Sequence, residues 1–247
     1  LTHAELNMEL LGAEGEQLCK VVKERWRDFN AVNAATAYQL LLTTMSARSA
    51  GQQGGGGRRR QSAHEEALTI LEPVLCNQHV QAFSARECAN TLHTLAKLQG
   101  RRPCGDVICA LEARALEVRE DFNPQNTGNM LWAFAMLGRQ PGNELVVGLT
   151  QRVLQFDLKP QDIAITLWAL ATLGRQPDYA VVVGLMERAL AVRHAFNPSD
   201  IANTLWALAT LGRQPDEALV VGLTERALVV CHAFSAQDVA NTLWAFA

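Results

Sequence analysis

Apolar residues recur at steps of three and four along the C-terminal half of the chain. In the clearest stretch, 196–233, two such series follow each other, separated by a short polar break. The first comprises Ile201, Leu205, Leu208 and Leu211, and the second comprises Leu219, Val220, Leu223, Ala227 and Val230. This spacing matches one face of an α-helix. The stretch therefore predicts two antiparallel helices.

The ends of these helices carry recognisable signals. Asn197 is a good N-cap, Pro198 suits the first helical position, and Asp200 favours the positive end of the helix dipole. Gly212 offers the left-handed conformation that ends helices. Arg213 and Gln214 then predict a tight turn, and Pro215 is predicted to begin the second helix.

A tryptophan marks the same position in successive segments. Trp132, Trp168, Trp206 and Trp244 are separated by 36, 38 and 38 residues, and His93 and Gln39 occupy that position in two earlier segments. A fixed period of this size is typical of helical repeats. The predicted organisation is an N-terminal helical segment (1–28), a degenerate repeat with a Gly/Arg-rich loop insertion (29–82, loop 47–62), repeats at 83–121, 122–157, 158–195 and 196–233, and the first helix of a truncated repeat (234–247).

One helix pair cannot bury both of its apolar faces, so successive copies must stack. We therefore predict an all-α fold, an α-solenoid of tandem antiparallel helix pairs of about 38 residues, with a concave binding surface. The composition agrees, since 49% of residues are hydrophobic while Phe 8, Trp 5 and Tyr 2 leave most of the packing to aliphatic residues.

Charge and cysteine content narrow the function classes. Lys+Arg 22 against Asp+Glu 25 gives a net charge of −3, too little positive charge to hold nucleic acid without a local arrangement. Six cysteines without a CxxC pair favour a reducing intracellular compartment. No apolar run reaches the roughly 18 residues of a membrane span, so we expect no membrane partner. The chain opens at Leu1 and stops inside a repeat, which we interpret as a fragment whose targeting peptide is out of view.

The Gly/Arg-rich stretch from Gly51 to Arg60 predicts a mobile loop, because glycine gains little from helix formation and neighbouring arginines repel one another. Its spacing does not match a phosphate-binding loop. An alternative function for Arg58 to Arg60 is an electrostatic tether for nucleic acid.

The segment Leu205-Trp-Ala-Leu-Ala-Thr-Leu-Gly212, echoed at 167–174 and 131–138, resembles the unit of the octotricopeptide repeat family. The resemblance is strong from Phe122 onward and weak before Phe83. It implies sequence-selective binding of single-stranded RNA by a chloroplast or mitochondrial factor acting in transcript maturation, stability or translation. Members of that family often carry a RAP domain beyond the repeats.

A polar stripe on the first helix of each repeat offers candidate base contacts. An amide side chain carries both a donor and an acceptor for an unstacked base. The alternative is that the asparagines bond to the neighbouring repeat, and their near uniformity favours this alternative. The candidates are Asn90, Asn129, Asn203, Asn241, Arg86, Gln125, Gln161, Ser199 and Gln237, with Ile165 as the clear break in the asparagine series.

The tryptophans and arginines also allow two interpretations each. Stacking on bases would use the indoles, but a core position between repeats is favoured. A row of arginines after the helix-ending glycines could contact phosphates, or could simply stabilise helix C-termini. The phosphate candidates are Arg101, Arg102, Arg139, Arg175 and Arg213. A second row, Arg152, Arg188 and Arg226, is predicted to be a solvated face.

No nucleophile motif, metal-ligand spacing or phosphate-binding loop is present, so we expect no enzyme, no metal, no cofactor and no small-molecule substrate. Residues 122–247 carry 8 basic and 10 acidic side chains, which weighs against strong RNA binding. Two functions therefore remain: an RNA-binding helical-repeat factor, and a protein-binding α-solenoid scaffold without a nucleic-acid ligand.

Overall fold

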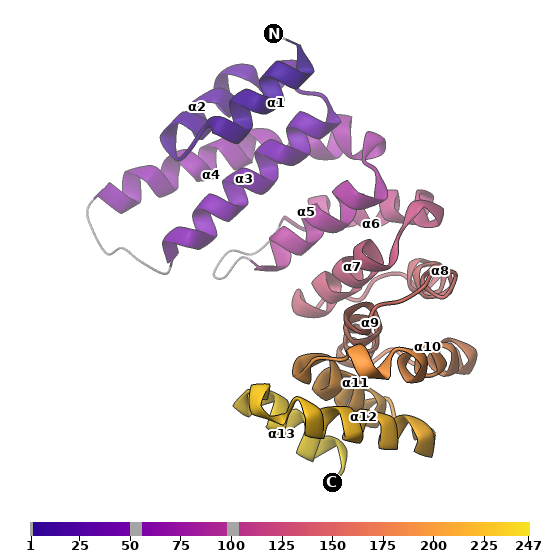
Figure 1. Ribbon diagram of the computed structural model, residues 1–247. Helices are drawn as coiled ribbons and strands as arrows, with labels where there is room; N and C mark the ends of the chain where they lie inside the picture. The colour runs from indigo at the N-terminus through magenta and orange to yellow at the C-terminus, as the bar shows by residue number, and fades with distance from the viewer. Residues whose placement is uncertain (1, 50–55, 98–103) are drawn as a thin grey trace. The chain divides into compact units, whose positions relative to one another are not determined.

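The computed structural model describes residues 2–49, 56–97 and 104–247. Within these ranges the chain forms 13 α-helices and no β-strand, and neighbouring helices pack against one another (Figure 1). The predicted all-α solenoid fold is confirmed. No helix in these ranges is both long and apolar enough to cross a bilayer. The chain divides into an N-terminal unit, Leu1–Val118, and a C-terminal unit, Arg119–Ala247.

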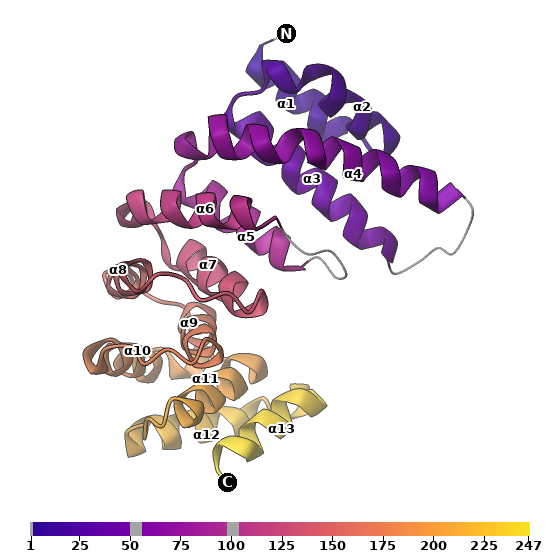
Figure 2. The same cartoon turned by 180° about the vertical axis from the view of Figure 1, so that it is seen from behind.

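The C-terminal unit consists of two layers of helices. One layer holds the first helices of successive pairs, each in contact with the next, and the second helices form the other layer (Figures 1 and 2). The first helices are α7 (Pro124–Met136), α9 (Pro160–Thr172), α11 (Pro198–Thr210) and α13 (Ala236–Ala245), and the second helices are α8 (Asn143–Val153), α10 (Tyr179–Ala191) and α12 (Glu217–Val229).

The first helices begin and end as their sequence signals predict. The Asn197 side chain accepts a hydrogen bond from the backbone N–H of Asp200, and Pro198 occupies the first turn. At the other end Gly212 has φ +63°, and the N–H groups of Gly212 and Arg213 donate to the carbonyls of Ala209 and Leu208. This is a Schellman motif, in which two terminal carbonyls of the helix are satisfied. Gly138 and Gly174 close α7 and α9 in the same way.

The second helix of this pair starts later than predicted. Helix α12 begins at Glu217, because Asp216 takes an extended conformation (φ −59°, ψ 143°) at the N-cap and Pro215 lies in the turn before it. Aspartate is favoured at an N-cap, where the backbone is not helical. The prediction of Pro215 as the first residue of the helix was therefore wrong.

In the C-terminal unit a buried aromatic or aliphatic residue precedes each of α7, α9 and α11, and a short 3-10 turn comes before it at α7 and α11. Phe122 and Phe196 follow such turns and are fully buried, and Leu158 lies at the same position. Around Phe196 the core takes residues from both layers, including Ile163, Leu185 and Leu223. His194 and His232, which share one repeat position, lie in such turns.

Glycines in the second helices allow the preceding turn to pack closely. A Cβ atom on Gly222 would collide with the Cδ of Arg193, which belongs to the 3-10 turn before the pair. Gly148 stands in the same relation to Arg119, with 2.8 Å between the added Cβ and Cδ. The aliphatic stems of these arginines therefore lie across the helix at a point where only glycine leaves room.

Within its described residues the N-terminal unit contains six α-helices, among them a helix pair that the repeat pattern did not reveal. Helices α1 and α2 are followed by a 3-10 turn, Trp26–Asp28, and by buried Phe29, the same sequence of elements that ends the later pairs. Helix α1 packs on α3, and α3 packs on α5. The helices are α1 (His3–Gly12), α2 (Glu16–Arg25), α3 (Ala31–Ser49), α4 (Gly56–Val74), α5 (Ala85–Lys97) and α6 (Gly105–Glu117).

The predicted loop at 47–62 is largely helical within the described residues. Helix α3 continues to Ser49 and α4 starts at Gly56, so that only 50–55 lie outside the described residues. Arginine, glutamine and alanine, which dominate 58–63, are good helix formers and outweigh the two leading glycines. The expectation of a loop over 47–49 and 56–62 was therefore wrong.

Candidate nucleic-acid interface

The polar stripe predicted on the first helices forms a continuous face of the C-terminal unit. On α11, Ser199, Asn203, Trp206 and Thr210 lie on the side opposite the buried Ile201, Leu205 and Leu208. We call the equivalent residues of the four helices the first-helix face. It comprises Gln125, Asn129 and Trp132 on α7, Gln161, Ile165 and Trp168 on α9, Ser199, Asn203 and Trp206 on α11, and Gln237, Asn241 and Trp244 on α13.

The amides of this face are mostly unpaired. Within the described part of the chain, the side chains of Asn129 and Asn203 are half-buried and make no hydrogen bond, while Gln125 and Gln161 are exposed. Asn241 accepts one from Gln237 at 2.8 Å, within its own helix. The alternative in which these asparagines bond from one repeat to the next is not found among these residues. Their donors and acceptors face outward.

Ile165 is the one apolar residue in this series, and a glycine on the neighbouring helix makes room for it. Gly128 on α7 stands where the other first helices have alanine. A Cβ atom added to Gly128 would lie 2.5 Å from Cγ2 of Ile165. The two departures from the repeat pattern therefore belong to one packing contact. We call the junction between two neighbouring first helices a step, and the α7–α9 step differs in this contact from the steps that follow it.

The tryptophans form a row on the same face. The ring centroids of Trp168 and Trp206 are 6.5 Å apart, and those of Trp206 and Trp244 are 6.1 Å apart, with interplanar angles of 34° and 40°. Trp168 and Trp206 are half-buried, and Trp244 is 54% exposed. Trp206 packs against the core cluster, which agrees with the preferred prediction that these indoles fill the core between repeats, but the indoles lie at the edge of that core and keep part of their surface exposed.

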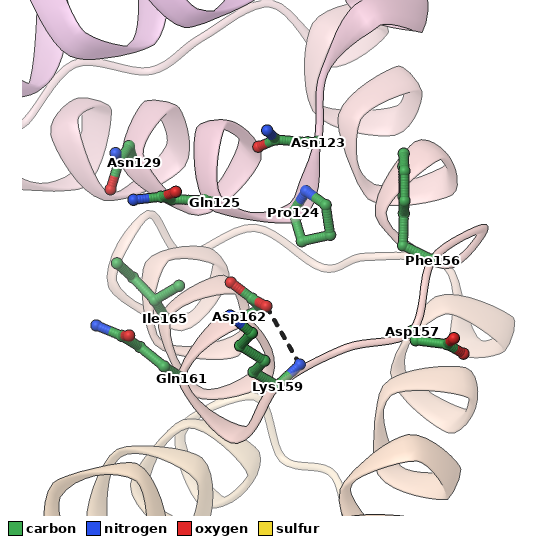
Figure 3. Close-up of a pocket in the computed structure, with 10 residues that line it drawn as sticks. All are labelled: Asn123, Pro124, Gln125, Asn129, Phe156, Asp157, Lys159, Gln161, Asp162 and Ile165. Carbon is green, nitrogen blue, oxygen red and sulfur yellow. Dashed lines mark hydrogen bonds between the residues drawn. The ribbon is translucent and has the colours of Figure 1, made fainter.

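A pocket of about 380 Å³ opens on this face between α7 and α9 (Figure 3). Gln125 and Asn129 line it from α7, and Gln161 and Ile165 face them from α9 (Figure 3). The carboxylate of Asp162 accepts a hydrogen bond from the backbone N–H of Lys159 at 3.2 Å, which fixes the start of α9. The remaining lining residues are Asn123, Pro124, Phe156 and Asp157.

Aspartates border the face at the N-terminal ends of three successive helices. Asp200 is buried, and burial together with the nearby charge of Asp162 raises the pKa of its carboxyl against the effect of a backbone hydrogen bond at Asn197. Burial would also raise the pKa of Asp238, but hydrogen bonds from Ser235 and Ser199 outweigh it and lower that pKa. Helix α7 carries neutral Asn126 at this position. This border of the face is therefore acidic and disfavours phosphate.

Two arginines of the first row make contacts within the protein. The Arg175 guanidinium donates to the carbonyl of Pro141, and the Arg213 guanidinium lies 5.6 Å from the ring centroid of Tyr179, so each ties its turn to the preceding pair. Gln140 adds a hydrogen bond to the Leu173 carbonyl at 2.7 Å. Arg139 is exposed. Arg101 and Arg102 lie outside the described residues.

The second arginine row does not form the predicted solvated face. Arg226 donates from Nε to the carbonyl of Phe196 at 2.8 Å, and Arg188 donates to the carbonyl of Leu154. In the N-terminal unit Arg114 binds the carbonyl of Phe83 at 2.9 Å. Carbonyls at the connecting segments accept these charge-assisted bonds, which explains why a cation recurs there.

The candidates of the N-terminal unit lie on α5, where Arg86 is exposed and Asn90 is half-buried. Position 93 holds a half-buried histidine in place of tryptophan, and burial lowers its pKa. All six cysteines are free. Burial raises the pKa of Cys88 to about 12 and that of Cys76 to about 11, so neither is a reactive thiolate at neutral pH.

Sequence reasoning missed the pocket as a site. It identified Gln125, Asn129 and Gln161 separately, but not Lys159, Asp162 or Phe156, which share their groove. Gly128 and Ile165 both depart from the repeat pattern, and this was the signal in the sequence that could have indicated the site. The two departures can be recognised as one feature only when α7 and α9 are known to be neighbours.

Fold and face together define a helical-repeat protein that carries amides and indoles on one layer of helices. The chain belongs to the family described as RNA-editing substrate-binding complex 6 protein, whose model matches residues 60–247. This is an RNA-associated family, and the match does not single out the octotricopeptide repeat family. A comparison with curated proteins finds no match.

Proposed function

We propose that this chain binds single-stranded RNA, with sequence preference, along the first-helix face of its C-terminal unit. The observation that carries the proposal is the set of unpaired amides at Asn129 and Asn203 beside half-buried indoles on one face. Amides supply donors and acceptors to base edges, and aromatic rings supply stacking surfaces, as in other single-strand readers.

The family description supports an RNA ligand, because it names substrate binding in RNA editing. We propose that the RNA is such a substrate and that the chain binds it without catalysing a reaction on it. A role in transcript maturation, stability or translation in a mitochondrion or chloroplast follows only from the octotricopeptide resemblance and stays a prediction.

Base contacts rather than phosphate contacts should dominate this binding. Arg175 and Arg213 each already make one contact within the fold, which leaves Arg139 and Lys159 as exposed cations of the C-terminal unit's candidate surface. With few phosphates neutralised, the affinity should fall only weakly with salt. Arg139→Ala should reduce this salt dependence further, whereas Arg175→Ala should lower thermal stability as well.

Fluorescence anisotropy with pools of short single-stranded RNA tests the proposal. The double variant Asn129→Ala, Asn203→Ala should bind about thirtyfold more weakly, as expected for two lost base contacts of roughly 1 kcal/mol each. Gln151→Ala is the matched control, since it removes an exposed amide from the outer helix α8. Circular dichroism verifies that all variants remain folded. Unchanged affinity in the double variant would refute the proposed face.

The second candidate function is a protein-binding scaffold, and the charge balance favours it. Residues 122–247 carry 8 basic and 10 acidic side chains, unlike most strong RNA binders. If the unmodified chain binds no RNA pool at low salt, RNA binding by this chain is excluded and the scaffold function is preferred.

A further inference from the structure

The α7–α9 step of the first-helix face is built differently from the two steps that follow it. It alone combines a glycine at 128 with an isoleucine at 165, and the pocket of about 380 Å³ lies at this step. At α11 and α13 the equivalent residues are alanine and asparagine, and Trp206 and Trp244 stand beside them. A ligand that runs along the face therefore meets a distinct environment here.

The chemistry of the pocket excludes a phosphate as its occupant. The lining contains one cation, Lys159, and two carboxylates, Asp157 and Asp162, so the local charge is negative. The other polar lining is neutral: Gln125, Asn129 and Gln161 offer amide donors and acceptors from both walls (Figure 3). Such a lining fits an uncharged planar group with hydrogen-bonding edges.

Ile165 supplies the apolar surface that such a group needs. Its Cγ2 packs against Gly128, and the side chain lines the pocket wall between Gln161 and Asn129 (Figure 3). Pockets that bind small planar ligands combine an apolar wall with a few convergent polar groups. Here the apolar wall comes from α9 and the amides from both helices.

We propose that this pocket binds one unpaired nucleobase of the RNA and selects a base with an exocyclic amino group over uracil. The inference rests on the proposed RNA-binding function and adds the position and the preference. Adenine, guanine and cytosine carry an exocyclic amino group that can donate to the Asp162 carboxylate and to the amide oxygens, whereas uracil has only its N3–H donor, flanked by two carbonyl oxygens that these acceptors repel. Gln161 supplies one of these acceptors, and Ile165 provides the apolar wall that holds the base against them.

The experiment measures base preference at each position of a short RNA, using the full chain and a set of oligonucleotides in which one position at a time carries each of the four bases. The unmodified chain should show one position at which uracil weakens binding by about fivefold or more. Ile165→Asn, which restores the residue found at the other steps, should abolish that preference while preferences at other positions persist.

Two further variants separate pocket contacts from folding. Gln161→Ala removes an exposed amide and should reduce the preference at the same position, while Gln151→Ala on α8 should leave every position unchanged. Ile165→Val keeps the apolar wall and should retain the preference. Thermal unfolding of each variant shows that the fold is intact.

The outcomes distinguish this inference from the function on which it rests. RNA binding with no uracil-sensitive position, or with a preference that Ile165→Asn and Gln161→Ala both leave intact, overturns the pocket but not the RNA-binding function. Absence of RNA binding by the unmodified chain overturns both.

Discussion

The two units of this chain build the same kind of helix pair with different sets of contacts. In the C-terminal unit the first helices α7, α9 and α11 each have 13 residues and end in a glycine with φ near +60°. In the N-terminal unit α3 and α4 each have 19 residues, and a π-helical turn follows α4 after Pro73. Regular end signals thus accompany a uniform length of the first helices in the C-terminal unit, whereas helix length varies from 10 to 19 residues in the N-terminal unit.

Side-chain contacts between helices differ in the same way. Arginine bonds to backbone carbonyls occur in both units, at Arg226 and at Arg114, but the tryptophan row belongs to the C-terminal unit. In the N-terminal unit Gln39 takes the tryptophan position and donates to the Thr91 hydroxyl at 3.2 Å, and Tyr38 donates to Glu72 at 3.0 Å. Individual polar pairs therefore replace a repeated aromatic contact where the motif has diverged. The stack survives because its apolar positions are retained.

Truncating the buried phenylalanine of each unit tests whether their cores are equally well packed. Phe83 and Phe196 are both fully buried, so Phe83→Ala and Phe196→Ala should each lower the free energy of unfolding by about 3 to 5 kcal/mol. Chemical denaturation gives the loss, and hydrogen exchange shows which helices lose protection. Leu228→Ala, at a position 72% exposed, is the control. A much smaller cost at Phe83 would show that the N-terminal core is looser.

Replacing the residue at the tryptophan position by alanine should lower the free energy of unfolding more in the C-terminal unit than in the N-terminal unit. Trp206→Ala loses a half-buried indole with contacts to both neighbouring rings, about 2 to 3 kcal/mol, whereas Gln39→Ala loses one hydrogen bond, about 1 kcal/mol. A double-mutant cycle between positions 168 and 206 should give a coupling of about 0.5 to 1.5 kcal/mol. Zero coupling would mean that the contact between the two indoles does not stabilise the packing of neighbouring helix pairs.

Two glycines of one repeat should respond oppositely to alanine. Gly212→Ala forces alanine into the left-handed region at φ +63° and should cost about 1 to 2 kcal/mol. Gly222→Ala gains up to about 1 kcal/mol of helix propensity but displaces the flexible Arg193 stem, so its net effect should be smaller. Thermal denaturation compares them. An equal loss of stability in the Gly212→Ala and Gly222→Ala variants would show that the Arg193 side chain cannot move aside for the added methyl group.

The smallest expected effect concerns the acidic border of the first-helix face. Because burial and Asp162 raise the pKa of Asp200, the ionised carboxylate disfavours the folded state above that raised pKa, and the penalty vanishes as pH falls below the ordinary value of 3.8. Asp200→Asn, which copies Asn126 of α7, should therefore raise Tm at pH 7 and leave it unchanged near pH 3. A lower Tm at pH 7 would contradict this pKa direction.

Most of the regular fold could be predicted from the residues because its signals are local. Asn197, Pro198 and Gly212 fix a helix by capping and backbone geometry within a few positions, and the apolar series around Leu205 identifies the buried side. The α1–α2 pair escaped prediction because only Phe29 and the turn before it match the later repeats. The helical start of α4 was not predicted, because the loop prediction gave more weight to its leading glycines than to the helix-forming residues that follow them.

The period, the caps and the apolar faces of this chain are properties of single segments, so the amino-acid order determined the helix pairs and their tendency to stack. Which side chains would meet across the stack depended on distances between residues some 30 to 40 positions apart. Those distances turned the tryptophans into a row, Arg175 and Arg226 into ties to backbone carbonyls, and Ile165 with Gly128 into one wall of a pocket. Contacts between helices arise only from packing, and packing is a property of the folded chain.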